Sequence, residues 1–201
     1  FATTRSVLQA EMKKYIPESL EYNLLFQKQT ALKFLMNSFF GCMENEWFRL
    51  SNKKLFNAVS QTGQEHVKWM SDHIKQLGLT VLYGDTDSIL IKCPDNKSPV
   101  ELGTELTAML NTTFAEFASR FGYDVKKDKL YLRVDFKCVY SRWFQAGKKK
   151  RYCGYVVWQD GKDLRAANAC YTEIKGFEYR RSNSPDWTRS MQKEMFTVLL
   201  T

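Results

Sequence analysis

The first 77 positions mix apolar and polar residues in helix-forming runs that contain few helix breakers. These runs predict three helices, over residues 5–15, 19–39 and 52–77. Pro17 separates the first helix from the second, and Ser19 is a favourable N-cap for the second. Because so few residues join these two helices, we expect them to form an antiparallel helical hairpin.

The pattern changes after Gly78, where short apolar and β-branched runs alternate with turn residues. These runs predict strands over residues 79–83, 88–92, 130–140, 152–158 and 171–175. We also expect a helix over 100–121, stopped by Gly122, and another that begins near Pro185. The predicted fold class is α+β, with a mainly antiparallel sheet, helices on one side of it and the helical hairpin projecting from it.

Composition and charge narrow the class of protein. The 201 residues are 44% hydrophobic and 14% aromatic, which is typical of a globular chain with one domain or two small subdomains. No apolar run is long enough to span a membrane, so no membrane partner is expected. The net charge of +8 suits a polyanion such as nucleic acid, although solubility alone is an alternative reason for it. Five scattered cysteines without a CxxC pair indicate reduced thiols and thus an intracellular protein. The expected location is the cytoplasm or nucleoid, or the nucleus if the source is eukaryotic.

An acidic tip joins two apolar strands in the sequence YGDTDS at 83–88. Asp85 and Asp87 are two positions apart, so strand alternation directs both carboxylates to one face. Paired carboxylates repel each other unless cations neutralise them, and hard oxygen ligands suit Mg²⁺. A bare DxD is more often an ordinary turn, but a whole hexapeptide between apolar arms is more specific. It resembles motif C of the family B DNA polymerases, in which such a hairpin holds metals beside the primer terminus.

A second motif lies in the segment KQTALKFLMNSFFG at 28–41. Lys33, Asn37 and Gly41 recur every four positions and form one stripe of a helix. A cation and a carboxamide on one face suit a triphosphate and a nascent base pair, and glycine lets DNA come close. The alternative is an amphipathic packing helix with a solvated lysine. The segment resembles motif B of the same family.

The resemblance extends to the residues around this helix. It implies that dNTP is bound by Arg5, Lys28, Lys33, Asn37 and Phe40, and that Gly41 contacts DNA. Arg5 has the spacing of a phosphate-binding arginine on the first fingers helix. Two residues depart from the family pattern. Phe40 replaces a tyrosine and so lacks its hydroxyl, and Gln9 stands where a second phosphate-binding lysine often follows.

A basic run, KKKRYCGY at 148–155, leads directly into a predicted strand. Basic residues interleaved with tyrosines suit a phosphate backbone, although a solvated loop is the commonest fate of a charge run. The run resembles the family's KKRY motif, which holds the primer strand near its 3′ end. The resemblance implies DNA contacts from Lys149, Lys150, Arg151 and Tyr152 and, at a junction similar to that of palm and thumb, from Lys175 and Gly176.

A third carboxylate is expected just before the basic run. The segment VDFKCVY at 134–140 resembles the family's LEFEKVY strand, in which Asp135 takes the place of a glutamate near the metals. Lys137 replaces a second acid there. Asp135 is therefore a candidate third metal ligand, with a plain surface residue as the alternative.

The resemblance spans almost the entire chain and implies fingers over 1–41, the second half of the palm over 42–178, and the start of the thumb over 179–201. The implied activity is that of a DNA-directed DNA polymerase, which transfers a nucleotide from dNTP to a primer 3′ end on primer-template DNA. Two Mg²⁺ ions, replaceable by Mn²⁺, would serve as cofactors, with Asp85 and Asp87 as the catalytic carboxylates.

A first catalytic aspartate precedes the fingers in this family, and nothing before Arg5 supplies it. The exonuclease domain and the rest of the thumb are also missing from the sequence. The chain is therefore expected to need a complementing segment that carries these parts, whether it belongs to a split polymerase, a longer gene or a chimera.

Two other classes of protein compete with this interpretation. A non-catalytic DNA-binding or scaffolding subunit derived from a polymerase would share the fold. The intact aspartates argue against it, because unused paired carboxylates only repel each other. Other palm enzymes, such as reverse transcriptases and nucleotide cyclases, lack the Lys-x-x-x-Asn-Ser helix before an acidic hairpin.

Overall fold

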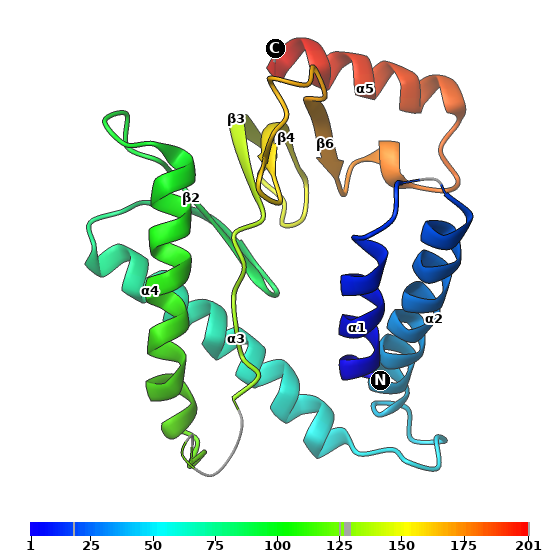
Figure 1. Cartoon of the computed structure of the whole chain (residues 1–201), viewed down its shortest axis with the longest axis vertical. Helices are drawn as coiled ribbons and strands as arrows, with labels where there is room; N and C mark the ends of the chain where they lie inside the picture. The colour runs from blue at the N-terminus through cyan, green and yellow to red at the C-terminus, as the bar shows by residue number, and fades with distance from the viewer. Residues whose placement is uncertain (18, 125, 127–129, 201) are drawn as a thin grey trace. The chain divides into compact units, whose positions relative to one another are not determined.

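The computed structural model describes residues 1–17, 19–124, 126 and 130–200 (Figure 1). The chain divides into two compact units, Phe1–Gly63 and Gln64–Thr201. Helices and antiparallel sheets are both present, so the predicted α+β class is confirmed. None of the helices in the described part of the chain is both long and apolar enough to cross a membrane. The subdomain boundaries expected at 41/42 and 178/179 stay predictions.

The first unit contains the predicted helical hairpin, formed by α1 (Ala2–Met12) and α2 (Leu20–Cys42). Ser19 caps α2, because its side-chain oxygen accepts a hydrogen bond from the Tyr22 N–H at 3.2 Å. The Arg5 Nε donates to Oε1 of the buried Gln29 at 3.3 Å and joins the two helices. The cap predicted at Ser19 is confirmed, whereas α1 ends at Met12, before the end at residue 15 that was expected from Pro17.

A hydrophobic core in the second unit forms between α3 (Lys53–Gln76) and α4 (Pro99–Ser119). The boundary between the two units falls within α3. Gly78, with φ of +74°, follows the end of α3 as expected. The buried residues of this core are Met70, Ile74, Leu102, Leu106, Leu110 and Phe114.

A two-stranded hairpin, β1 (Val81–Asp85) and β2 (Ser88–Ile91), packs on this core. Its apolar side chains Val81, Ile89 and Ile91 contact the core and fix the base of the hairpin. Asp85 pairs with Ser88 in the antiparallel register, so the turn consists of two residues and has φ of +51° at Thr86. The hairpin predicted from YGDTDS is confirmed, and its acidic tip points away from the buried base.

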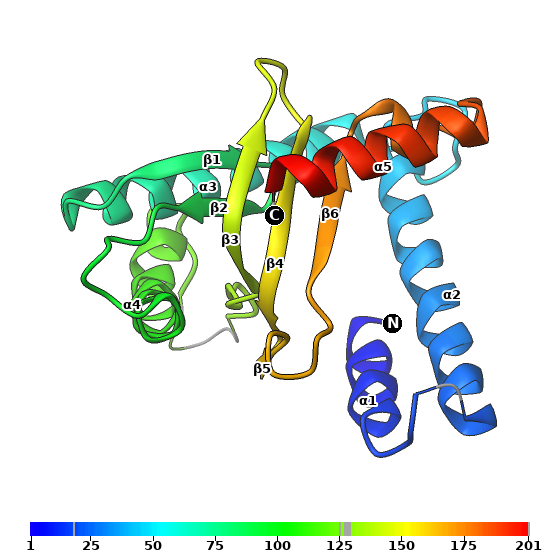
Figure 2. The ribbon, with the colours of Figure 1, turned by 90° about the horizontal axis from the view of Figure 1, so that it is seen from above.

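The second sheet of this unit has β4 (Tyr152–Gln159) at its centre, between β3 (Cys138–Gln145) and β6 (Tyr171–Lys175) (Figure 2). A short β5 (Lys162–Asp163) also pairs with β4, and all pairings are antiparallel. A 3₁₀ turn, η1 (Glu178–Arg180), leads to α5 (Asp186–Leu200), which packs across the sheet. The strands of the described residues thus form two antiparallel sheets where the sequence suggested one.

The strand expected over 130–140 begins only at Cys138, which corrects the prediction for its first part. Leu130, Leu132 and Val134 do alternate with exposed residues and pack against the core of α3 and α4. The side-chain amide of Asn111, however, bonds both the N–H and the C=O of Val134 at 2.9 Å. Here a side chain satisfies the backbone polar groups that a neighbouring strand would otherwise bond, so the alternating pattern does not mark a strand.

Candidate active site

The two predicted catalytic carboxylates lie at the tip of the β1–β2 hairpin. Asp85 ends β1 with its side chain 30% exposed, and Asp87 is exposed in the turn. The Thr86 hydroxyl donates to Asp85 Oδ1 at 3.0 Å, and the Ser88 hydroxyl donates to the Asp85 carbonyl at 3.3 Å. Short hydroxyl side chains therefore order the tip while its carboxylates stay accessible to a ligand.

The predicted basic run approaches this tip through one residue, Lys150. It lies in the turn between β3 and β4, where its φ of +64° is unusual for a residue with a side chain. Its backbone N–H donates to the Tyr83 hydroxyl at 2.9 Å, and its Nζ lies 3.8 Å from Asp85 Oδ1. The structure thus brings together two predicted motifs that are far apart in the sequence. Its neighbours in the run, Lys148 and Lys149, are exposed.

An aromatic cluster supports the junction of hairpin and basic turn. Tyr152 stacks on Trp143, with ring centroids 4.4 Å apart, and lies 5.4 Å from the Tyr83 ring. Burial raises the pKa of Tyr152 to about 12, with Glu173, Tyr83 and Asp85 adding to the effect. Its phenol is therefore neutral at physiological pH, and the ring serves as a rigid, uncharged side of the site.

Sequence reasoning missed a carboxylate on β6. Glu173, with a side chain only 15% exposed, accepts a hydrogen bond from the Tyr140 hydroxyl at 2.5 Å and pairs with the Lys175 ammonium at 2.9 Å. Burial alone would raise the pKa of Glu173, but Tyr140 and Lys175 outweigh burial and the pKa is lowered. Glu173 therefore holds the predicted DNA-binding Lys175 in place. The local signal that could have identified Glu173 is its position two residues before Lys175 in a predicted strand, because alternation places both side chains on one face.

Two more predicted DNA-binding residues, Arg151 and Gly176, lie directly before β4 and directly after β6. Arg151 approaches Glu178 at 4.0 Å. Gly176 has φ of +67°, and a Cβ there would overlap the carbonyl oxygen of Lys150. The end of β6 therefore packs directly on the backbone of the basic turn, and only glycine fits this contact.

The third predicted metal ligand, Asp135, pairs with Arg133 at 2.9 Å, and both side chains are more than 70% exposed. Among the described residues, no three His, Cys, Asp or Glu side chains gather in a way that could hold a metal ion, so Asp135 does not complete a cluster with the hairpin carboxylates. Mg²⁺ in phosphoryl-transfer sites needs only one or two carboxylates, because substrate phosphates and water fill its other positions. The accessible oxygen donors of Asp85 and Asp87 fit that requirement.

Lys33, Asn37 and Gly41, the first two predicted to bind nucleotide and the third to contact DNA, form a stripe on α2, and the predicted nucleotide residue Lys28 lies on another face of the same helix. Lys28, Lys33, Asn37 and Gly41 are all exposed. Arg5 is partly buried and bonded to Gln29, as described above. Phe40 stacks on Phe56 with ring centroids 4.7 Å apart, so the residue that replaces the expected tyrosine has a packing role.

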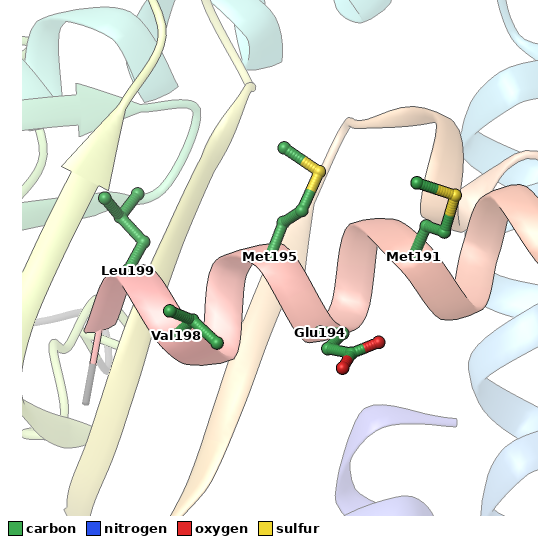
Figure 3. A pocket seen from close by; sticks show the side chains of 5 residues that line it. All are labelled: Met191, Glu194, Met195, Val198 and Leu199. Atoms are coloured by element: carbon green, nitrogen blue, oxygen red, sulfur yellow. The ribbon is translucent and has the colours of Figure 1, made fainter.

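A shallow depression of about 390 Å³ lies on α5, away from these motifs in sequence (Figure 3). It is lined by Met191, Glu194, Met195, Val198 and Leu199. Four of its five side chains are apolar, and it shares no residue with the acidic tip or the basic turn. Its chemistry does not suit phosphate or metal binding.

Two DNA polymerases match most of this chain in sequence. The chain is 31% identical over 198 residues to "DNA polymerase 2" of Aeropyrum pernix, a match that covers 98% of this chain and 20% of the relative. It is 32% identical over 174 residues to the "DNA polymerase alpha catalytic subunit" of Mus musculus, covering 84% of this chain and 10% of that subunit. A solved family B DNA polymerase from Pyrobaculum calidifontis aligns with 98% of this chain and 23% of its own, at 25% identity and a TM-score of 0.49.

The chain therefore spans about a fifth or less of the length of these relatives. The family model described as "DNA polymerase family B" matches residues 1–201, the whole sequence. The matched region includes the acidic hairpin, the basic turn and the stripe on α2. This chain belongs to DNA polymerase family B.

Proposed function

We propose that the chain is the nucleotidyl-transfer segment of a DNA-directed DNA polymerase, which joins a dNTP to the 3′ end of a primer on primer-template DNA. The contact between the acidic tip and the basic turn carries this proposal. Asp85 and Lys150 are 65 positions apart, yet the Lys150 Nζ lies 3.8 Å from the Asp85 carboxylate. A site that binds metal-bound triphosphate beside a DNA backbone needs carboxylates and cations next to each other in this way.

In this proposal Asp85 and Asp87 hold Mg²⁺, and each side chain has a distinct role. The metal, when bound, supplies positive charge that stabilises the phosphate oxygens during transfer. The exposed stripe of Lys33 and Asn37 on α2 binds the incoming nucleotide. Lys149, with Tyr152 beside it, positions the primer strand through its phosphates. None of these contacts reads base edges, which suits an enzyme that must accept every sequence.

The enzyme would act together with a complementing segment. A two-metal transfer needs carboxylates that clamp both the attacking and the leaving oxygen. Asp85 and Asp87 supply two, and Asp135 lies away from them in an ion pair with Arg133. The first catalytic aspartate of the family, the exonuclease domain and the rest of the thumb would come from that segment. The small share of each relative that the chain covers supports this proposal.

The test is primer extension by the complemented enzyme and its Asp87→Ala variant, with primer-template affinity measured in parallel. We expect Asp87→Ala to abolish incorporation and to leave DNA binding largely intact, because only the metal-bound transition state loses a ligand. Asp135→Ala is the matched control, an exposed aspartate in the same unit, and should change the rate much less. A non-catalytic DNA-binding subunit would instead give the same extension with and without Asp87.

A further inference from the structure

Lys150 differs from the other lysines of the basic run in the conformation of its backbone. The run contains three successive lysines, and only Lys150 has a positive φ, +64°. A left-handed conformation is unfavourable for a residue with a Cβ and persists only where the surroundings impose it. A specific structural cause is therefore required at this position.

Two contacts from different elements impose this conformation. The Tyr83 hydroxyl, on β1, accepts the hydrogen bond of the Lys150 N–H at 2.9 Å. On the other side, Gly176 at the end of β6 packs against the Lys150 carbonyl so closely that a Cβ would overlap it. The Lys150 backbone is thus hydrogen-bonded at its N–H and tightly packed at its carbonyl, and its side chain starts beside the acidic tip.

The side chain of Lys150 reaches the carboxylate that is proposed to bind metal. Its Nζ lies 3.8 Å from Asp85 Oδ1, while Thr86 donates a hydrogen bond to the same oxygen at 3.0 Å. The Lys150 side chain is 68% exposed and that of Asp85 30% exposed. Ion pairs with this much solvent contact change an equilibrium by only about two- to fivefold, so a divalent cation can displace the ammonium.

From these contacts we propose that Lys150 is the counter-ion of Asp85 in the metal-free protein, and that the Lys150 ammonium and a divalent cation bind this carboxylate in alternation. Tyr83 and Gly176 are the positioning residues, because their contacts with the Lys150 backbone keep its ammonium close to Asp85. The released ammonium stays at the tip, where a backbone phosphate of DNA is its next partner. This inference rests on the proposed metal-binding role of Asp85.

The exchange also distinguishes two lysines of the basic run, Lys149 and Lys150. Lys149 has no ion pair with the tip among the interactions described, and its charge is available to DNA at all times. The charge of Lys150 becomes available only when the carboxylate has another cation. Metal binding and one DNA contact are thereby coupled through a single carboxylate, and such coupling acts in both directions.

Zero-length cross-linking of the full chain with a carbodiimide tests the metal-free contact. The reagent adds to a carboxyl group, a lysine amine that lies against it displaces the adduct to form an amide, and the reagent leaves as its urea. Peptide mapping should find Asp85 joined to Lys150 much more often than to Lys149. Asp85→Asn removes the carboxyl group and should abolish the product. Tyr83→Phe, which keeps the ring but removes the acceptor of the Lys150 N–H, should lower the yield about two- to fivefold. Equal yields for the two lysines, or an unchanged yield in Tyr83→Phe, would overturn the proposal.

The metal half of the proposal is tested by repeating the reaction with MgCl₂ and with NaCl at the same ionic strength. We expect MgCl₂ to suppress the Asp85–Lys150 product at least twofold more than NaCl does, because a bound divalent cation occupies the carboxylate. Equal suppression by both salts would show that no exchange occurs. Loss of incorporation in Asp87→Ala together with equal suppression would leave the polymerase function standing and remove only the exchange. Selective suppression by MgCl₂ without any effect of Asp87→Ala on extension would do the reverse.

Discussion

The acidic tip of the β1–β2 hairpin and the stripe on α2 both resemble motifs of the family, but the contacts around the two regions differ. Asp85 is bonded to Thr86, paired with Lys150 and mounted on strands that pack against a buried core. Lys33 and Asn37, by contrast, are exposed on the surface of a helix. The described residues thus include partners for the tip, whereas Lys33 and Asn37 face solvent and, in the proposed function, contact the incoming nucleotide.

This difference predicts how each region responds to substitution. A residue embedded in contacts of its own chain affects stability when it is changed, and a residue that waits for a ligand affects binding or rate alone. At the tip, two carboxylates lie close together and repel each other. The Lys150 ammonium and the Thr86 hydroxyl partly offset this repulsion.

The largest effect is expected for the core that carries the hairpin. Phe114 is fully buried between α3 and α4, and Phe114→Ala should lower the free energy of unfolding by about 3–5 kcal/mol. Asn37→Ala on the exposed stripe should change it by less than about 0.5 kcal/mol. Urea unfolding followed by circular dichroism measures both. A destabilisation of similar size in the two variants would remove the contrast between the regions.

The next effect concerns the stripe itself. Lys33→Ala in the complemented enzyme should raise the apparent KM for dNTP and slow the chemical step, for a loss in kcat/KM of roughly ten- to a hundredfold. Lys13→Ala, an exposed lysine of the same unit, is the matched control and should stay near the parent value. Weaker primer-template binding with unchanged nucleotide kinetics would mean that Lys33 contacts DNA instead.

A smaller effect is expected at the basic turn. Lys149→Ala should weaken primer-template binding about equally for unrelated sequences and reduce the slope of log K against log salt by roughly one unit. Lys162→Ala, which removes an exposed lysine from β5, should leave that slope unchanged. Salt titrations of DNA binding with two unrelated duplexes provide the measurement. Matching slopes in Lys149→Ala and the parent would assign the run to an ordinary solvated loop.

The smallest effect is a pH dependence of the core beneath the hairpin. His66 is buried against Phe114, its Nε2 has no hydrogen-bond partner among the described residues, and burial lowers its pKa below the usual 6.5. The unfolded chain therefore binds a proton at His66 more readily than the folded chain does. Stability should fall as the pH drops below about 6.5 towards the lower pKa of the folded state. His66→Phe should flatten this part of the stability profile, and an unchanged slope would contradict the assignment.

Local signals in the sequence predicted most elements of the fold. Ser19 caps a helix, Gly78 and Gly122 follow helix ends, and β6 spans the five residues expected for it. Each of these depends on backbone preferences of one or a few neighbouring residues, which the sequence states directly. The strand predicted at 130–137 failed because the backbone there bonds to a residue that is distant in the sequence. Its alternating pattern was correct for burial, but the bonding partner was the distant side chain of Asn111.

The candidate site was predictable residue by residue but not as an assembly. The motifs identified Asp85 and Lys150 separately, yet nothing local states that a lysine 65 positions later would approach that aspartate. Glu173 was missed for the same reason, because its partner Tyr140 lies 33 positions away on another strand. Contacts of this kind follow from how β3, β4 and β6 pair, which depends on the whole sheet.

The most direct measurement is the metal preference of an Asp87→Cys variant in the complemented enzyme. A thiolate binds Mg²⁺ poorly and softer cations well, whereas carboxylates favour Mg²⁺. If Asp87 is a metal ligand, the single-turnover rate of incorporation with Mg²⁺ should fall by about a thousandfold. Replacing Mg²⁺ by a softer cation such as Cd²⁺ should restore part of that rate in the variant but not in the parent. A variant that keeps a near-normal rate with Mg²⁺, or that gains nothing from the softer cation, would contradict a metal-binding role for the acidic hairpin.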